Sequence, residues 1–281
     1  MRVIEKISDL KAVIRSQKLS GKIIGFVPTM GYLHEGHISL VKASKDENDF
    51  TIMSIFVNPT QFGPNEDFEK YPRDMARDSK MAEEAGVDII FAPTREEMYP
   101  DSYKTYIEVE DITGVLCGKT RPGHFKGVTT VVAKLFNIVE PDKAYFGQKD
   151  AQQVIVIKKM VRDLNMNLEV VICPIIREYD GLAMSSRNSY LSTGERKAAV
   201  ILSKSLFEAK ELIKNGERDA SKLIKYISER ISTVDFAEID YVEITDAENL
   251  EEVEMINGKV LIALAVRFGK TRLIDNVVVE V

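Results

Sequence analysis

The chain has 281 residues, of which 44% are hydrophobic and 29% charged, and its formal net charge is −6. This length allows one large domain or two ordinary ones with a substantial core. The negative charge argues against non-specific nucleic-acid binding, and no run approaches the ~20 apolar residues that a membrane span needs. We therefore expect a soluble globular protein with neither a nucleic-acid nor a membrane partner.

The first 22 residues mix charged and apolar residues at helical spacing, and they predict an amphipathic helix rather than a signal peptide. The two cysteines, Cys117 and Cys173, lie far apart and form no C-x-x-C pair. This spacing is typical of a reducing cytoplasm and argues against a disulfide framework or a zinc ribbon.

Short apolar runs alternate with helix-like segments through the first part of the chain. The predicted strands are 22–27, 51–57, 87–92, 143–146 and 168–173. The predicted helices are 36–47, 73–86, 127–139 and 150–164. This alternation indicates an α/β fold, with a parallel sheet covered by helices on both faces.

The pattern changes after about residue 187. Two charged amphipathic helices are predicted at 194–214 and 218–233, and three strands at 237–245, 259–268 and 271–281. Turn signals separate these strands, which indicates an α+β unit with an antiparallel sheet. We place the boundary near 176–190 and divide the chain into domains 1–176 and 177–281, an arrangement that suits a gated site between them.

The stretch "PTMGYLHEGH" (28–37) contains two of the three histidines and follows a predicted strand. Open parallel sheets bind ligands at the carboxyl ends of their strands, and helix N-termini attract anions. His34 and His37 are therefore predicted to lie where a phosphate binds. The alternative is that one histidine caps the helix and the other lies on the surface. Zinc is disfavoured, because only His124 remains as a third imidazole.

Two glutamines follow predicted strands. Gln61 lies in a loop after Asn58, where its amide could satisfy both a hydroxyl and a carboxylate, although such a stretch is more often a plain turn. Gln153 follows Asp150 at a helix start, and the pair could face a ligand or form a capping box.

Basic residues gather at three places in this acidic chain. Lys149 follows Gly147 at a helix start, and Arg187 follows two serines at the domain boundary. The loop "CGKTRPGHFKGV" holds a further basic cluster of Lys119, Arg121, His124 and Lys126. These charges indicate an anionic ligand, although the loop could equally be a solvated surface. A serine nucleophile is disfavoured, because no G-x-S-x-G elbow is present.

Five stretches carry a family resemblance when they are taken together. "HEGH" with the downstream "MSSR" resembles the H-x-G-H and K-M-S-K-S pair of the nucleotidylyltransferase superfamily, which includes class I aminoacyl-tRNA synthetases. "PTMGYLHEGH", "FVNPTQFGPNEDFEKYPR", "RPGHFKGV", "YFGQKDAQQ" and "DGLAMSSRNSYLS" resemble the pantothenate synthetase family, in order and across nearly the whole chain.

The resemblance implies a Rossmann-like N-terminal domain and a two-step reaction. Pantoate and ATP would give pantoyl adenylate and pyrophosphate, and β-alanine would then give pantothenate and AMP. It implies ATP and Mg²⁺ as requirements and a homodimer, while the cysteine pattern predicts a cytoplasmic protein. Tyr32 departs from the family, which commonly has a small residue there. The metal ligands are unknown, and Asp78 is a weak candidate.

The resemblance also implies roles for individual residues. The catalytic set is His34, His37, Lys149 and Arg187, with His37 as proton donor. The ATP-binding set is Met30, Gly31, Tyr32, Leu33, His34, Glu35, Gly36, His37, Gly147, Gln148, Lys149, Asp150, Ile176, Met184, Ser185, Ser186 and Arg187. Gln61 and Gln153 would bind pantoate, with Gln61 also near β-alanine. The chemistry requires positioning and cationic stabilisation, which the catalytic set would supply with help from Arg121 and Lys126.

Three other functions stay open. A nucleotidylyltransferase that releases a stable nucleotide conjugate is disfavoured by the two glutamines and the C-terminal domain. A tRNA synthetase fragment is disfavoured by the net acidity, and a non-catalytic nucleotide-binding regulator would form no pyrophosphate.

Overall fold

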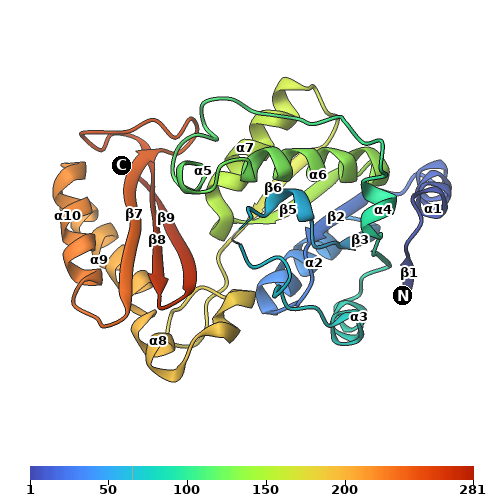
Figure 1. The fold of residues 1–281 in the computed structure, drawn as a ribbon. Coiled ribbons are helices and arrows are strands. Elements are labelled where there is room, and N and C mark those ends of the chain that lie inside the picture. The colour runs from blue at the N-terminus through green and yellow to red at the C-terminus, as the bar shows by residue number, and fades with distance from the viewer. Residues whose placement is uncertain (65) are drawn as a thin grey trace.

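A computed structural model describes residues 1–64 and 66–281 and shows a six-stranded sheet followed by a three-stranded one (Figure 1). The larger sheet has the strand order β1-β4-β3-β2-β5-β6, and all its neighbouring strands are parallel. Its strands are β1 (Arg2–Ile4), β2 (Ile24–Thr29), β3 (Phe50–Ile55), β4 (Ile89–Phe91), β5 (Lys143–Gly147) and β6 (Glu169–Cys173). The predicted fold class is confirmed, and each of the five predicted strands is present.

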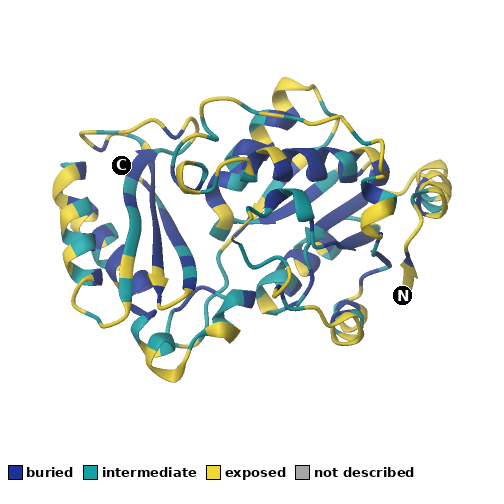
Figure 2. Cartoon of the chain, viewed as in Figure 1, coloured by how far each residue is buried: buried dark blue, intermediate teal, exposed yellow. Residues whose placement is uncertain are grey.

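Helices cover both faces of the parallel sheet because each carries an apolar stripe. One face packs against α1 (Ile7–Leu19), α6 (His124–Val139) and α7 (Ala151–Asp163). The other face packs against α2 (Glu35–Glu47) and α3 (Met75–Glu84). Figure 2 shows the central strands mostly in the buried colour, while the outer helix surfaces are exposed. Burial on both faces explains why the strands are continuous apolar runs in the sequence.

Several short elements were not predicted from the sequence. The amphipathic helix predicted for residues 1–22 begins only at Ile7, because Arg2–Ile4 form the edge strand β1 beside β4. Three residues are too few for a periodic pattern, which explains this error. Short helices α4 (Arg95–Met98) and α5 (Cys117–Thr120) were not predicted either, and α5 occupies the start of the predicted basic loop.

The C-terminal unit contains an antiparallel sheet in the order β7-β8-β9. Its strands are β7 (Ala237–Asp246), β8 (Lys259–Phe268) and β9 (Thr271–Glu280), and its helices are α8 (Thr193–Ala198), α9 (Ile201–Lys214) and α10 (Ala220–Ile231). The single helix predicted at 194–214 is two helices, with the buried pair Ala199 and Val200 in a turn between them. The backbone dihedrals of this pair stay in the right-handed helical region.

The two faces of the small sheet contact different neighbours. One face packs on α9 and α10 in a core that contains residues from 182 to 279. The other face contributes Leu261 and Ala263 to a small cluster with Leu116 and Ala151 of the first unit. The main cores of the large sheet contain residues from 4 to 173. The division at 176/177 stays a prediction.

Candidate active site at the strand ends

The pocket opens where the direction of the chain reverses within the parallel sheet. β2 and β5 are neighbours, and the strands that follow each of them extend toward opposite edges. Such a switch point leaves a crevice at the carboxyl ends of the two strands. A cavity of about 240 Å³ lies there, and a cleft of about 730 Å³ adjoins it toward β8 and β9.

The two histidines at the start of α2 cap the helix reciprocally. His34 is the N-cap, and its Nδ1 accepts a hydrogen bond from the Gly36 N–H at 3.1 Å. His37 Nδ1 accepts from the His34 N–H at 3.3 Å. Capping was the alternative to a ligand-binding role, but both rings also line the pocket, so the capping does not exclude the ligand-binding role, which stays a prediction.

Burial keeps both of these imidazoles neutral at pH 7. Desolvation, aided by the nearby Lys149 charge, lowers the pKa of His34 to about 4. Desolvation, aided by His34, holds the pKa of His37 well below its ordinary value. Because each Nδ1 accepts a backbone N–H, the single ring proton of each neutral imidazole is on Nε2. The free protein therefore offers neutral donors here, not the cations that we expected.

Asp78 fixes the loop between β2 and α2. Its carboxylate accepts hydrogen bonds at 2.7 Å from the backbone N–H groups of both Tyr32 and Leu33, and its side chain is 1% exposed. This explains how Tyr32 is held at φ +50°, a conformation unusual for a large residue. Asp78 is not among the pocket-lining residues, and its weak candidacy as a metal ligand stays a prediction.

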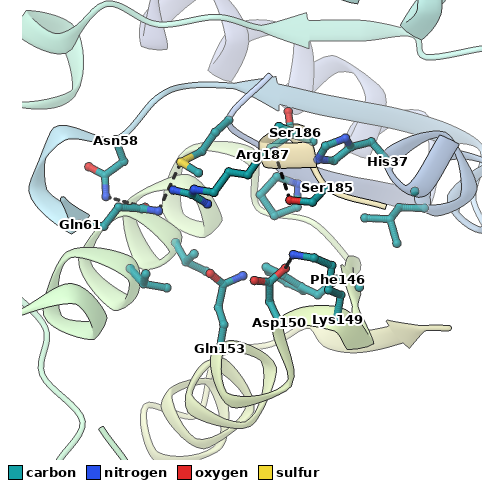
Figure 3. A pocket seen from close by; sticks show the side chains of 18 of the residues that line it. His37, Asn58, Gln61, Phe146, Lys149, Asp150, Gln153, Ser185, Ser186 and Arg187 are labelled. Carbon is teal, nitrogen blue, oxygen red and sulfur yellow. Dashed lines mark hydrogen bonds and ion pairs between the residues drawn. The ribbon is translucent and has the colours of Figure 1, made fainter. Parts of the chain in front are cut away.

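Gln61 is oriented by its neighbour Asn58. Asn58 Nδ2 donates to Gln61 Oε1 at 3.0 Å and to the Gly127 carbonyl at 3.1 Å (Figure 3). This leaves Gln61 Nε2 as the donor that faces the pocket, where it contacts Met30 Sδ at 3.3 Å. The 3₁₀ turn that carries Gln61 also packs tightly on α6, since a Cβ added at Gly127 would lie 2.3 Å from the Thr60 carbonyl oxygen.

Gln153 extends toward the same pocket from α7, on the side opposite Gln61 (Figure 3). The capping box considered for Asp150 and Gln153 is not formed, because the Asp150 side chain makes no capping hydrogen bond. Asp150 lies instead 3.8 Å from Lys149 Nζ. Gln153 is therefore free to bind a ligand.

Arg187 is held by a carboxylate that the sequence did not reveal. Asp67 accepts hydrogen bonds from Arg187 Nε at 3.0 Å and from one terminal nitrogen at 2.9 Å. Ser185 Oγ accepts from the Arg187 backbone N–H at 3.2 Å. Ser185, Ser186 and Arg187 all line the pocket, and Asp67 balances the positive charge of Arg187; their role as a phosphate-binding fork stays a prediction.

The basic cluster after α5 divides between the pocket and the surface. Arg121 forms a bidentate pair with Glu66 at 2.6 Å for both contacts and lies 3.0 Å from His124 Nε2. His124 also contacts the Gln61 carbonyl, and burial lowers its pKa to about 4. Lys126 pairs with Glu108 and does not line the pocket, and its assisting role stays a prediction.

Most predicted site residues lie around this one cavity. Those that line it are Met30, His34, Gly36, His37, Gln61, Gly147, Lys149, Asp150, Gln153, Ile176, Met184, Ser185, Ser186 and Arg187. Those that do not line it are Gly31, Tyr32, Leu33, Glu35 and Gln148. Among these, Leu33 belongs to the core and Gln148 donates a hydrogen bond to Asn276. The predicted ATP-binding roles of all five residues stay predictions.

An apolar wall of the pocket was missed. It consists of Val128, Val131 and Leu135 on α6 together with Phe146 at the end of β5. Residues 128, 131 and 135 recur at helical spacing, so the stripe is visible in the sequence, but the same pattern marks any core-facing helix. Only the position of α6 at the strand ends distinguishes this stripe as part of a site.

The comparisons with known proteins agree with this geometry. The family model described as pantoate-beta-alanine ligase matches residues 2–278. A curated pantothenate synthetase from Acetivibrio thermocellus is 72% identical over 281 residues, which is 100% of both chains. The crystal structure of pantothenate synthetase from Thermus thermophilus has a TM-score of 0.94 at 45% identity and covers 99% of both chains.

A second solved relative has ligands in its crystal. The pantoate-beta-alanine ligase from Francisella tularensis, complexed with beta-gamma ATP and beta-alanine, has a TM-score of 0.80 at 37% identity. The match covers 99% of this chain and 97% of that one. No helix in the part of the chain that the structure describes is long and apolar enough to cross a membrane.

Proposed function

The chain belongs to the pantoate-beta-alanine ligase family and forms pantothenate from pantoate and β-alanine with ATP, and we propose that the pocket at the β2/β5 switch point carries out both steps. The observation that carries this proposal is the convergence of two neutral histidine donors, two amides and Lys149 on one cavity. The residue roles below are part of the proposal.

In the first step the pantoate carboxylate attacks the α-phosphorus of ATP, and the bond to the pyrophosphate oxygen breaks. Negative charge then grows on the leaving pyrophosphate, so the site needs preorganised donors and cations rather than a protein nucleophile. The Nε2–H groups of His34 and His37 would donate to phosphate oxygens, and Lys149 would balance the growing charge. A ring whose pKa rises beside the phosphates can then protonate, which is how His37 would act as proton donor.

Pantoate would bind between the two glutamines. Its carboxylate and hydroxyls need donors and acceptors, and the oriented Nε2 of Gln61 supplies a donor opposite the amide of Gln153. Its two methyl groups need an apolar surface, which Val131, Leu135 and Phe146 provide. In the second step the β-alanine amine would attack the acyl carbon beside Gln61, releasing AMP.

Arg187 would exchange one anion for another when ATP binds. In the free protein Asp67 occupies one bidentate edge of the guanidinium, formed by Nε and one terminal nitrogen, and such an edge also suits a phosphate. ATP would replace this carboxylate, so nucleotide binding and release of the loop that carries Asp67 are coupled.

We propose that Mg²⁺ enters with ATP. Among the described residues no group of three or more His, Cys, Asp or Glu could hold a metal by itself. This fits Mg²⁺, which is usually bound by one or two carboxylates plus substrate phosphates. Asp150 lines the pocket beside Lys149 and is the carboxylate best placed to contribute. The ion would neutralise charge on the triphosphate.

We also propose a homodimer in a reducing compartment such as the cytoplasm. The family supports the dimer, and the free thiols of Cys117 and Cys173 support the compartment. Analytical ultracentrifugation should give about twice the 31.7 kDa chain mass. A monomer at micromolar concentration would refute the dimer and leave the catalytic proposal intact.

Exchange of labelled pyrophosphate into ATP tests the two-step proposal. Exchange should require pantoate and should not require β-alanine, since the first step is complete without the amine. Lys149→Ala should reduce it by about two orders of magnitude or more, the scale of one lost preorganised contact. Lys158→Ala, an exposed lysine on α7, is the matched control and should leave exchange unchanged.

Two results would contradict the proposal. If exchange needs β-alanine, the amine joins before the first chemical step. If mass spectrometry finds a stable nucleotide conjugate instead of AMP and pantothenate, the pocket performs only nucleotidyl transfer.

The variant Gln153→Ala should mainly raise the pantoate concentration that is needed for exchange.

A further inference from the structure

The side chain of Asn276, on β9, binds the turn that carries Lys149. Its Nδ2 donates to the carbonyl oxygen of Gln148 at 3.0 Å and to that of Lys149 at 2.9 Å. Its Oδ1 accepts from Gln148 Nε2 at 3.0 Å. One amide from the C-terminal sheet thus makes three hydrogen bonds to two successive residues at the end of β5.

These hydrogen bonds are shielded from water. Asn276 is 3% exposed, and both N–H groups of its amide are used, so the orientation of the amide is determined. An unmade hydrogen bond costs more at a buried position than at a solvated one, because no water replaces the lost partner. The turn at Gln148–Asp150 therefore has one preferred position relative to β9.

Asn276 is itself anchored on the opposite side. Its backbone N–H donates to Asp275 Oδ1 at 2.8 Å, and Asp275 forms a bidentate pair with Arg177 at 2.6 and 2.9 Å. Arg177 also donates to the Gly181 carbonyl, which ties this segment to the connection between the two units. A chain of fixed groups runs from that connection to Lys149.

We propose that Asn276 is a positioning residue for the adenylation step. It holds the Lys149 backbone so that the ammonium group meets the leaving pyrophosphate, and it makes this geometry depend on the docking of the C-terminal sheet. The inference rests on the proposed role of Lys149. Asn276 lines the adjoining cleft and not the cavity itself, so it acts through the turn.

The isosteric variant Asn276→Asp tests this role. It removes both donors and places a carboxylate oxygen against two carbonyl oxygens, so the turn should move. A displacement of about 1 Å in a catalytic group can cost ~100-fold in rate, and we expect pantoate-dependent exchange to fall by roughly 10- to 100-fold. The reaction of supplied pantoyl adenylate with β-alanine should stay close to normal, because no pyrophosphate leaves in that step.

Two comparisons separate positioning from a general loss of structure. Val279→Ala opens a cavity in the C-terminal core on the other face of β9 and should lower the melting temperature without the selective loss of exchange. In a Lys149→Ala background, Asn276→Asp should cause almost no further loss, since both act through the same group. If Asn276→Asp prevents folding, Asn276→Ser, which keeps one donor, takes its place in both comparisons.

The outcomes are distinguishable. If Lys149→Ala exchanges normally, the proposed role of Lys149 fails. If Lys149→Ala is impaired but the Asn276 variants behave like Val279→Ala, or if the losses from Asn276 and Lys149 multiply independently, the positioning role of Asn276 is refuted.

Discussion

Lowering the pH from about 7.5 to about 5 should destabilise this protein through its buried histidines. The folded-state pKa of His34 is about 4, against an ordinary value of 6.5. A group with a depressed folded-state pKa stabilises the fold above its unfolded pKa, and this stabilisation is lost as the pH falls toward the folded pKa. For His34 the window therefore runs from pH 6.5 down to about 4.

The size of the effect follows from the two pKa values. A pH of about 5 lies about 1.5 units below the unfolded pKa of His34 but above its folded pKa, so the unfolded imidazole is protonated and the folded one is not. This difference lowers the free energy of unfolding by about 2 kcal/mol. His124 has the same folded-state pKa of about 4 and should contribute a similar amount. Paired carboxylates such as Glu66, whose pKa is lowered, lose their contribution mainly at more acidic pH.

His34→Asn isolates one histidine without removing the helix cap, because asparagine is a favoured N-cap residue. Urea unfolding of both proteins at the two pH values should show that the variant loses about 2 kcal/mol less than the parent protein. Equal losses in the two proteins would show that His34 is not held neutral, and the assignment of its proton to Nε2 would fail with it.

Two further substitutions test the supports of the site. Gly127→Ala places a Cβ 2.3 Å from the Thr60 carbonyl oxygen, so the turn that carries Gln61 must move. We expect the fold to lose about 1–3 kcal/mol of stability and the KM for pantoate to rise. An unchanged KM would contradict this reasoning. Asp78→Ala leaves the buried N–H of Leu33 and the partly buried N–H of Tyr32 without an acceptor, at about 1–3 kcal/mol each for buried groups. Urea unfolding should therefore show a loss of about 2 kcal/mol, and a loss below ~0.5 kcal/mol would contradict the role of Asp78.

The central strands could be predicted from the sequence because burial on both faces makes them continuous apolar runs. The edge strand Arg2–Ile4 could not, since three residues carry no period. The turn at Ala199 and Val200 could not be predicted either. Both residues are buried and apolar, so they continue the apolar stripe of the predicted helix and give no sign that it ends.

The motif residues of the site could be predicted because their spacing is local. Their partners could not, because those contacts join distant parts of the chain. Asp67 and Arg187 are 120 positions apart, and Asn276 lies 127 positions from Lys149. Nothing near Asp67 in the sequence indicates which arginine it binds. The charge state of His34 was also misjudged, because burial cannot be read from the motif itself.

The reciprocal capping at the start of α2 limits how evolution or a protein engineer can change this stretch. Each ring of His34 and His37 uses Nδ1 to cap the helix, and Nε2 is the atom that we propose binds the ligand. Since each helical residue advances by about 100°, one inserted or deleted residue between them would turn the second ring away from both partners. The length of the segment between the two rings is therefore constrained. Under the proposed function, helix initiation and ligand recognition use the same side chains, so neither property can be optimised without testing the other.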